Sequence, residues 1–194
     1  MITVSKALKI VTRETPKLGI ERIALEVSIG RVLAEDIIAD SDLPPFDRSQ
    51  MDGYAVKAAD TTLAPVTLTL VGESAAGRGW RKTLRSGQAV RIMTGASVPT
   101  GADAVQKLEL ARENGETVTL LEPTEKGRFI VPKGKEVKKG TTVLGSGERI
   151  TASNISVPAA FGYAKVKVSK RARVAIISTG SEIVEIKKKP GRDQ

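Results

Sequence analysis

Residues 43–56 read LPPFDRSQMDGYAV, and the rest of the chain is organised around this stretch. Pro44 and Pro45 fix their own φ angles and hold the preceding residues extended, so the stretch begins as a stiff connector. Polar side chains follow, and Asp52-Gly53 is a dipeptide typical of tight turns. Its few apolar side chains give it anchors of its own in a chain that is only 3% aromatic. Local chemistry leaves two interpretations open: an ordinary connector that ends in a hairpin turn, or a rigid functional loop.

The composition is typical of soluble globular domains, with 40% hydrophobic and 27% charged residues. A chain of 194 residues is long enough for one large or two small domains with their own cores. No apolar run approaches the length of a membrane span, and the first residues lack the apolar core of a signal peptide. We therefore expect a cytoplasmic protein without membrane contact, and the absence of cysteine agrees with that compartment.

The chain contains neither histidine nor cysteine, which excludes the usual zinc sites, thiol nucleophiles and imidazole acid–base catalysis. Carboxylates, lysine, arginine, hydroxyls and hard cations such as Mg²⁺ remain, a set that suits phosphate and oxyanion substrates. The net charge of +9 is concentrated in the second half, in clusters at 133–139, 165–173 and 187–189. Nucleic acid is one partner for such a surface, but six scattered aromatic residues are too few for a base-stacking platform. An anionic small molecule or a solvated basic face fits at least as well.

Hydrophobic periodicity predicts a β-rich α+β chain. A helix is expected over 3–14, and short strands separated by glycine, proline or asparagine turns then suggest a small β-barrel or sandwich over about 48–128, with a hairpin at Asn114-Gly115. A second helix is expected from Thr151 to about Phe161. The expected strands cover residues 23–25, 66–71, 89–93, 104–110, 117–121, 128–131 and 165–167, with a flexible loop at 72–79.

The last segment has a different character. Residues 173–178, RVAIIS, form a continuous β-branched run typical of a strand buried on both faces of a parallel sheet. Residues 179–182 then occupy the usual ligand position at the end of such a strand. The residues that remain are fewer than a βαβ unit needs. We expect the chain to be the front piece of a longer polypeptide, which an intact gene with a stop codon after Gln194 would contradict.

Several motifs, in order and at matching spacing, resemble those of the molybdopterin molybdenumtransferases, which include the E domain of gephyrin among their eukaryotic relatives. The resemblance covers essentially the whole chain. The matching segments are residues 43–56, 30–36, 91–96 with 98–105, 134–140 and 178–183.

The resemblance implies a fold and an activity. Residues 1–46 with 131–168 would form an elongated first domain, 47–130 a β-rich domain inserted in it, and 169–194 the opening strand and loop of a truncated α/β third domain. The family forms homodimers with the active site between subunits. Its reaction consumes adenylylated molybdopterin and molybdate, uses Mg²⁺ and releases AMP. The piece alone is therefore expected to be inactive, and other proteins of molybdenum cofactor biosynthesis are possible partners.

The resemblance also implies roles for single residues. Asp52, Thr94 and Glu182 match polar residues of the family's active site. Arg91, Ser49 and Lys135 are candidates for binding molybdate or phosphate, because cations and hydroxyls stabilise oxyanions. Asp52 and Glu136 are candidate metal ligands, since a hard cation prefers oxygen.

Two departures from the family pattern affect these roles. Glu136 stands where many relatives have aspartate, and its extra methylene displaces the carboxylate enough to weaken its case as a ligand. Ser181 replaces a common aspartate beside Glu182.

Other interpretations stay open. Asp52 can be a turn former, Thr94 a strand end and Glu182 a solvated carboxylate. A gephyrin-like scaffold without catalysis is the alternative function. Charge alone suggests a third, a basic nucleic-acid-binding β domain, whose binding would depend steeply on salt.

Overall fold

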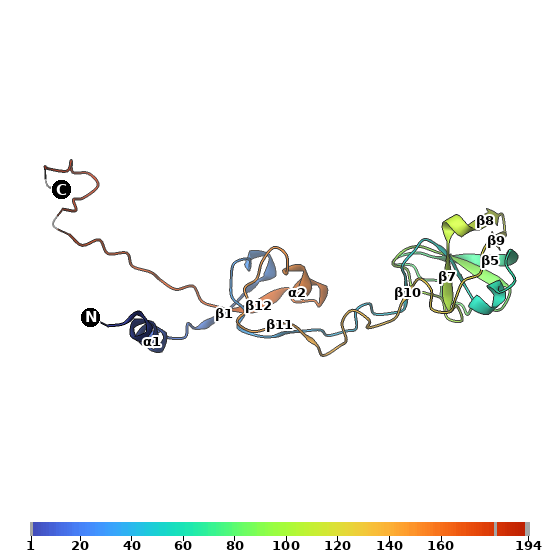
Figure 1. Ribbon diagram of the computed structural model, residues 1–194, viewed down its shortest axis with the longest axis horizontal. Coiled ribbons are helices and arrows are strands. Elements are labelled where there is room, and N and C mark those ends of the chain that lie inside the picture. Colours follow the sequence, from blue (N-terminus) through green and yellow to red (C-terminus); the bar gives the residue numbers. More distant parts are fainter. Residues whose placement is uncertain (1, 181, 193–194) are drawn as a thin grey trace. The chain divides into compact units, whose positions relative to one another are not determined.

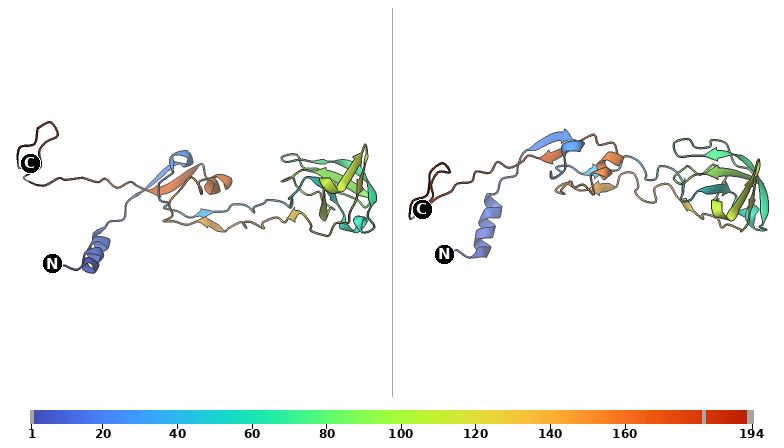
Figure 2. Two further views of the ribbon diagram at one scale, coloured as in Figure 1. Left: turned by 45° about the horizontal axis from the view of Figure 1, so that its top comes forward. Right: turned by 90° about the horizontal axis from the view of Figure 1, so that it is seen from above.

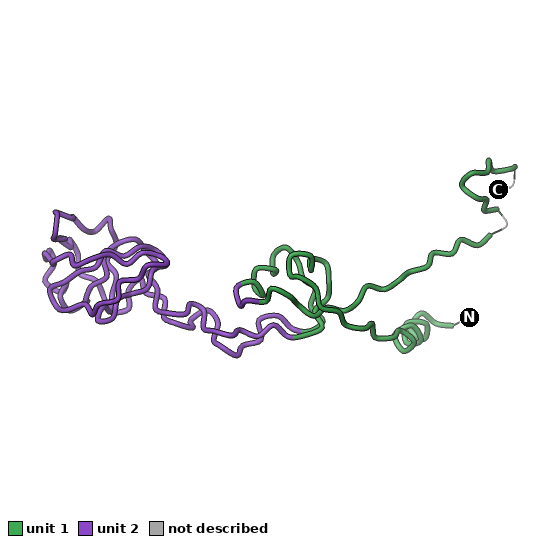
Figure 3. Tube along the Cα trace, turned by 180° about the vertical axis from the view of Figure 1, so that it is seen from behind, with its two compact units in different colours: residues 1–35, 146–159, 163–194 green, residues 36–145, 160–162 purple. Residues whose placement is uncertain are grey.

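The computed structural model describes residues 2–180 and 182–192 and divides the chain into two compact units (Figure 3). The first unit contains residues 1–35, 146–159 and 163–194, and the second contains 36–145 and 160–162. The expectation of a β-rich α+β chain is confirmed, because helices are few and short strands dominate (Figure 1).

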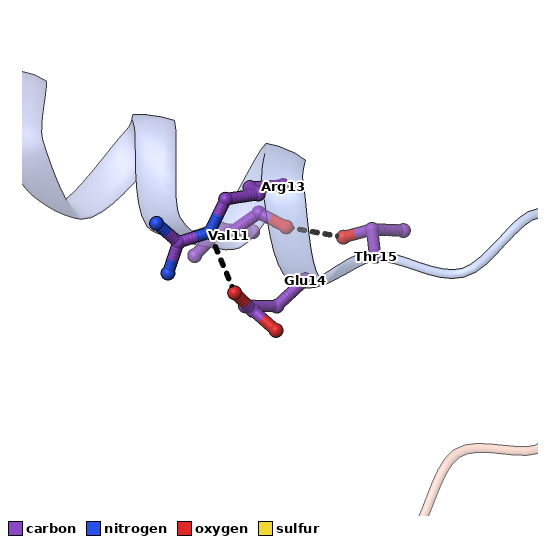
Figure 4. Close-up of polar contacts among 4 residues, drawn as sticks. All are labelled: Val11, Arg13, Glu14 and Thr15. Carbon is purple, nitrogen blue, oxygen red and sulfur yellow. Dashed lines mark hydrogen bonds and ion pairs between the residues drawn. The ribbon is translucent and has the colours of Figure 1, made fainter.

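The first unit begins with helix α1 (Val4–Glu14), which confirms the helix expected over 3–14. Thr3 caps its start, where its hydroxyl accepts a hydrogen bond from the Lys6 amide at 3.3 Å. At its end the Thr15 hydroxyl donates to the Val11 carbonyl at 2.6 Å, and Arg13 pairs with Glu14 (Figure 4). No residue of α1 is buried, so the helix depends on its caps and intrinsic propensity rather than on packing within this unit.

Strands β1 (Ile20–Ala24) and β12 (Lys165–Ser169) pair antiparallel in the first unit. Along β12, Val166 and Val168 are fully buried while Lys165 and Lys167 are exposed, so the predicted alternating strand with a basic face is confirmed. The sequence placed the earlier strand at 23–25. The structure ends it at Ala24, because residues Leu25–Val27 form the 3₁₀ helix η1.

The helix expected from Thr151 is shorter than predicted. Helix α2 covers only Ser156–Ala160, because the Asn154 side chain accepts a hydrogen bond from the Thr151 amide at 2.8 Å. This bond stabilises a turn that competes with helical hydrogen bonding.

In the second unit, residues 36–49 lie antiparallel to residues 130–144. Strand β2 (Ile37–Ile38) pairs with β11 (Thr142–Leu144), and β3 (Arg48–Ser49) pairs with β10 (Ile130–Val131). Between these pairs the Leu43 amide donates to the Val137 carbonyl at 2.7 Å. The strand expected over 128–131 is reduced to β10, because Phe129 has a φ of 56° that breaks the extended backbone.

The remaining strands form one curled six-stranded sheet in the order β7-β4-β6-β5-β9-β8 (Figure 2). β5 and β6 are parallel and every other pair is antiparallel. The strands are β4 (Gly53–Val56), β5 (Val66–Ser74), β6 (Gln88–Ile92), β7 (Ala104–Lys107), β8 (Ala111–Asn114) and β9 (Thr117–Leu120). Short 3₁₀ helices η2 (Ala58–Thr61) and η3 (Leu108–Leu110) follow β4 and β7.

The neighbouring strands β4 and β6 carry buried side chains on both faces of this sheet. Tyr54 and Val56 of β4 pack in one apolar cluster, and Ala55, between them, packs in another with Val90 and Ile92 of β6. This double burial holds the β4 and β6 backbones rigid at the end of the sheet where the candidate site lies.

Two further expectations are corrected and one is confirmed in this sheet. The loop expected over 72–79 begins later, because β5 continues through Gly72 to Ser74. The strand expected over 104–110 ends at Lys107 and continues as η3. The hairpin at Asn114-Gly115 joins β8 to β9, with Asn114 opposite Thr117, as predicted.

The prediction of a strand over 173–178 is wrong, because the structure has no strand there. Val174 is 80% exposed and Ile176 is 91% exposed, and neither belongs to a strand. An apolar run becomes a strand only when neighbouring backbone accepts its hydrogen bonds, and no strand within the described residues pairs with it. No helix among the described residues is long and apolar enough to cross a membrane.

Candidate active site

The register of the sheet brings Asp52 to Thr94. Gly53 at the start of β4 lies opposite Ile92 at the end of β6, so the residues just outside both strands meet at one end of the sheet. There Asp52 Oδ1 accepts hydrogen bonds from the Thr94 amide at 2.7 Å and from the Thr94 hydroxyl at 2.9 Å. Two residues 42 positions apart in sequence therefore form a single polar unit.

These contacts favour the ionised form of Asp52. The backbone hydrogen bond from Thr94 lowers the pKa of Asp52 most, followed by the hydroxyl of Thr94, and the positive charge of Arg91 contributes further. The carboxylate is exposed and is ionised at neutral pH. Because the folded-state pKa is depressed, the stabilising contribution of these contacts is present above the ordinary pKa of 3.8 and is lost as the pH falls through the lowered value.

Gly53 has a packing role rather than the turn role that the Asp-Gly dipeptide indicates. It is the first residue of β4, and it lies between β6 and β7. A Cβ added at Gly53 would overlap the carbonyl oxygen of Gln106, whose carbon would be only 2.9 Å away. Only glycine lets the β7 backbone approach this closely, so the hairpin interpretation of Asp52-Gly53 is wrong.

Ser49 stabilises the loop that carries Asp52 through hydrogen bonds of its side chain and backbone. Its side chain is buried, and its hydroxyl donates to the Met51 carbonyl at 2.6 Å. The Ser49 backbone exchanges hydrogen bonds with the Thr94 loop, because Gly95 donates to the Ser49 carbonyl at 2.9 Å and Ser49 donates to Ala96 at 3.0 Å. This arrangement favours a structural role for the hydroxyl. Its predicted anion-binding role stays a prediction.

Arg91 of β6 is held by a polar network on the same sheet. Its Nη1 lies 3.5 Å from Glu113 Oε2, which also accepts a hydrogen bond from the Tyr54 hydroxyl at 2.6 Å. Burial of Tyr54 and its bond to Glu113 raise the pKa of Tyr54 to about 12, so the phenol remains a donor at neutral pH. Glu113 offsets part of the Arg91 charge, and because both side chains are about a third exposed the guanidinium is able to exchange partners.

A pocket of about 360 Å³ lies beside this unit. It is lined by Arg48, Ser49, Gln50, Thr94, Gly95, Val131 and Glu136. The Arg48 guanidinium forms an ion pair with Glu136, which links the residue-43–56 stretch to the basic glycine-bracketed loop. Both side chains are more than a third exposed, so this pair contributes little to stability and leaves Arg48 able to exchange partners.

Arg48 was not among the candidate site residues, although it lies in the stretch that organises the chain. The sequence signal was available, because a cation directly before Ser49 in a rigid polar loop suits an oxyanion. What the sequence could not supply was the pairing of β3 with β10, which brings Glu136 to Arg48.

Two further predicted site residues, Lys135 and Glu182, come from other segments of the chain. Lys135 is exposed in the glycine-bracketed loop, where its amide donates to the Pro132 carbonyl at 3.1 Å. Glu182 is exposed and belongs to the other compact unit, in a segment without strand or helix. Ser181, the departure beside it, lies outside the described residues.

The donor set at the site fits a weakly held hard cation better than a closed metal cage. Within residues 2–180 and 182–192 no group of three or more acidic side chains is arranged to hold a metal ion. Asp52 offers one exposed carboxylate, and Glu136 is engaged by Arg48. Mg²⁺ typically binds through one or two carboxylates with substrate phosphates and water, so Asp52 fits as a single protein ligand.

The sequence of the chain matches a family model over residues 2–162. That model describes the MoeA N-terminal region, domain I and II, and it covers most of the chain. The chain belongs to the MoeA family.

Individual relatives agree with this assignment. A molybdopterin molybdenumtransferase from Staphylococcus aureus is 39% identical over 189 residues, and one from Staphylococcus epidermidis is 38% identical. Each match covers 95% of this chain but 45% of the relative, so the chain spans less than half the length of these transferases. A crystal structure of the molybdopterin biosynthesis MoeA protein from Pyrococcus horikoshii matches all of this chain and 51% of its own, with a TM-score of 0.82 and 37% identity.

The residues of this chain that meet where β4 begins and β6 ends come from two of the recognised motifs. Asp52 belongs to the 43–56 stretch and Thr94 to the 91–96 stretch. The relatives that match are named as molybdopterin molybdenumtransferases or as a molybdopterin biosynthesis protein.

Proposed function

We propose that the polypeptide containing this chain inserts molybdate into adenylylated molybdopterin and releases AMP. In this proposal the second unit supplies Asp52 and Thr94 to the active site, and Glu182 of the first unit keeps the catalytic role that the resemblance implies. The observation that carries the proposal is the exposed carboxylate of Asp52, held ionised by Thr94 beside a pocket that contains Arg48.

The lowered pKa of Asp52 separates two chemical roles. A general base works best when its pKa lies near the operating pH. The pKa of Asp52 is lowered from an ordinary value of 3.8 and so lies far below neutral pH. We therefore assign Asp52 to orienting a bound group or holding a cation rather than to removing a proton. Thr94 donates both of its hydrogen bonds to Oδ1 of Asp52, which leaves Oδ2 as the oxygen that we assign to the bound group.

The arginine side chains near Thr94 are assigned to binding the anionic substrates. Arg48 lines the pocket, and Arg91 lies on β6, which ends at Ile92, two residues before Thr94. Both guanidinium groups can donate two parallel hydrogen bonds to phosphate or molybdate oxygens. Ser49 and Lys135 remain secondary candidates for the same task. Mg²⁺, when bound, would neutralise phosphate charge, and Asp52 is the residue of this chain that we propose as its ligand.

We further propose that the complete protein is a cytoplasmic homodimer and works with other proteins of molybdenum cofactor biosynthesis. The gephyrin-like scaffold without catalysis is not favoured, because the relatives at 38–39% identity are named as transferases.

The proposal is tested with the complete polypeptide encoded by the gene that contains this sequence. Purified protein with bound adenylylated molybdopterin and Mg²⁺ is expected to release AMP when molybdate is added, and not when sulfate is added at the same ionic strength. AMP release is followed by chromatography. Folded protein that releases no AMP with molybdate would reject the transferase assignment.

A further inference from the structure

A second pocket in the same unit is formed by the end of β5 and the loop that follows it. It has a volume of about 630 Å³ and is lined by Glu73 and by residues between Ala75 and Lys82. Its cationic lining consists of Arg78, Arg81 and Lys82, and Trp80 supplies its aromatic surface. We call it the Trp80 pocket. None of the functional residues discussed above contributes to it.

The loop that forms the Trp80 pocket is tightly fastened. Ser74 is completely buried, its hydroxyl donates to the Ser97 carbonyl at 2.8 Å, and it accepts a hydrogen bond from the Trp80 amide at 3.3 Å. The Ser74 carbonyl also accepts a hydrogen bond from the Met93 amide at 3.1 Å. The loop is thus joined to the segment that carries Thr94, and it presents its side chains from a fixed backbone.

Trp80 is held against backbone. A Cβ added at Gly72 would lie 2.5 Å from the indole nitrogen of Trp80, so the edge of the ring rests on the glycine of β5. The indole packs partly against the apolar cluster of Val90 and Ile92 and is otherwise half-exposed in the pocket. A ring fixed in this way offers a flat surface to a ligand at little entropic cost.

The three cationic side chains of the pocket form no ion pairs among the described residues. Arg78, Arg81 and Lys82 are exposed, and across the part of the chain that the structure describes none of the three is within ion-pair distance of a carboxylate. Arg48, Arg91 and Lys167 elsewhere are paired. Glu73 is the one carboxylate that lines the pocket, which leaves an excess of positive charge.

We propose that the Trp80 pocket binds a ligand that joins a phosphate to a planar ring, the chemistry of a nucleotide. The arginines would donate paired hydrogen bonds to the phosphate, and the ring would stack on the indole. The volume lies within the range of small-molecule sites. This inference does not rest on the proposed transferase activity, because the pocket and its ligand class are defined by their own residues.

Trp80 is the only tryptophan of the chain, so all tryptophan fluorescence of the folded chain comes from this pocket. The 194-residue chain is titrated with AMP, with inorganic phosphate and with adenosine. We expect saturable quenching by AMP at a concentration at least about tenfold below that needed for phosphate or adenosine, because the two halves of the site act together. No saturable change with AMP, or AMP binding no tighter than phosphate, would overturn the proposal.

Three variants locate the binding. Replacing Arg78, Arg81 and Lys82 with glutamine is expected to weaken AMP binding at least about tenfold, the effect of losing charge-assisted hydrogen bonds. Glu73→Gln is expected to tighten it severalfold, because a like charge is removed. The matched control replaces Lys187, Lys188 and Lys189 with glutamine, removes the same charge and should leave AMP binding unchanged. Equal weakening in both triple variants would show nonspecific attraction and reject the site.

Discussion

Replacing Asp52 with alanine is expected to reduce molybdate-dependent AMP release by the complete protein about 10² to 10³-fold, the scale of losing one preorganised electrostatic group. The reason is specific to the site: Asp52 presents an ionised carboxylate that Thr94 holds from both its amide and its hydroxyl. Asp52→Asn keeps the shape and the acceptor oxygen but removes the charge, so it should be nearly as slow. Initial rates of AMP formation at saturating molybdate measure both variants.

Asp60→Ala is the matched control for this prediction. Asp60 lies in the same unit and is also hydrogen-bonded by a hydroxyl and a backbone amide, from Ser86 at 2.6 Å and Gly87 at 2.8 Å. It contributes to neither pocket described here, so its removal should leave the rate of AMP release unchanged. Full activity in Asp52→Ala, or an equal loss in Asp60→Ala, would mean that the Asp52 carboxylate has no particular part in the reaction.

Gly53→Ala is expected to lower the free energy of unfolding of the second unit by about 3 kcal/mol or more, the upper range for inserting a methyl group into a packed interior. The new methyl group would overlap the Gln106 carbonyl of β7, and this backbone cannot move without breaking the β4–β7 pairing. Urea unfolding of the 194-residue chain, followed by the fluorescence of Trp80, measures the change.

Gly115→Ala provides the comparison for Gly53. A Cβ at Gly115 would meet no atom within 4 Å, so only its φ of 59° opposes the substitution, at about 1 kcal/mol. A Gly53→Ala chain that unfolds at the same urea concentration as the Gly115→Ala chain would contradict the close approach of β4 and β7.

Local sequence pattern was enough to predict those helices, strands and turns that are determined by neighbouring residues. The capped helix after Thr3, the alternating strand with buried Val166 and Val168, and the hairpin at Asn114-Gly115 all follow from periodicity and turn chemistry. The same reasoning failed where a remote segment decides the outcome. Asp52-Gly53 has the composition of a turn, yet Gly53 is a strand residue because β7 passes against it.

The apolar run at 173–178 is a second case in which local sequence pattern did not predict the structure. Its composition is that of a buried strand, but a strand forms only when a second segment accepts its backbone hydrogen bonds. Within the described residues no strand pairs with this run. At the site, motif order identified Asp52 and Thr94 separately. Their contact through a shared hydrogen-bonded oxygen depends on the β4–β6 register, which no local pattern encodes.

The most direct test of this account is the pKa of Asp52, measured in the 194-residue chain by carboxyl ¹³C NMR over a pH titration. The structure predicts a pKa below the ordinary value of 3.8, because Thr94 donates two hydrogen bonds to the carboxylate. Thr94→Val should raise that pKa by removing the hydroxyl donor, and Thr94→Ser, which keeps the hydroxyl, should leave it low. An Asp52 that titrates at its ordinary value in the wild-type chain, or that does not respond to Thr94→Val, would contradict the pairing on which the candidate site depends.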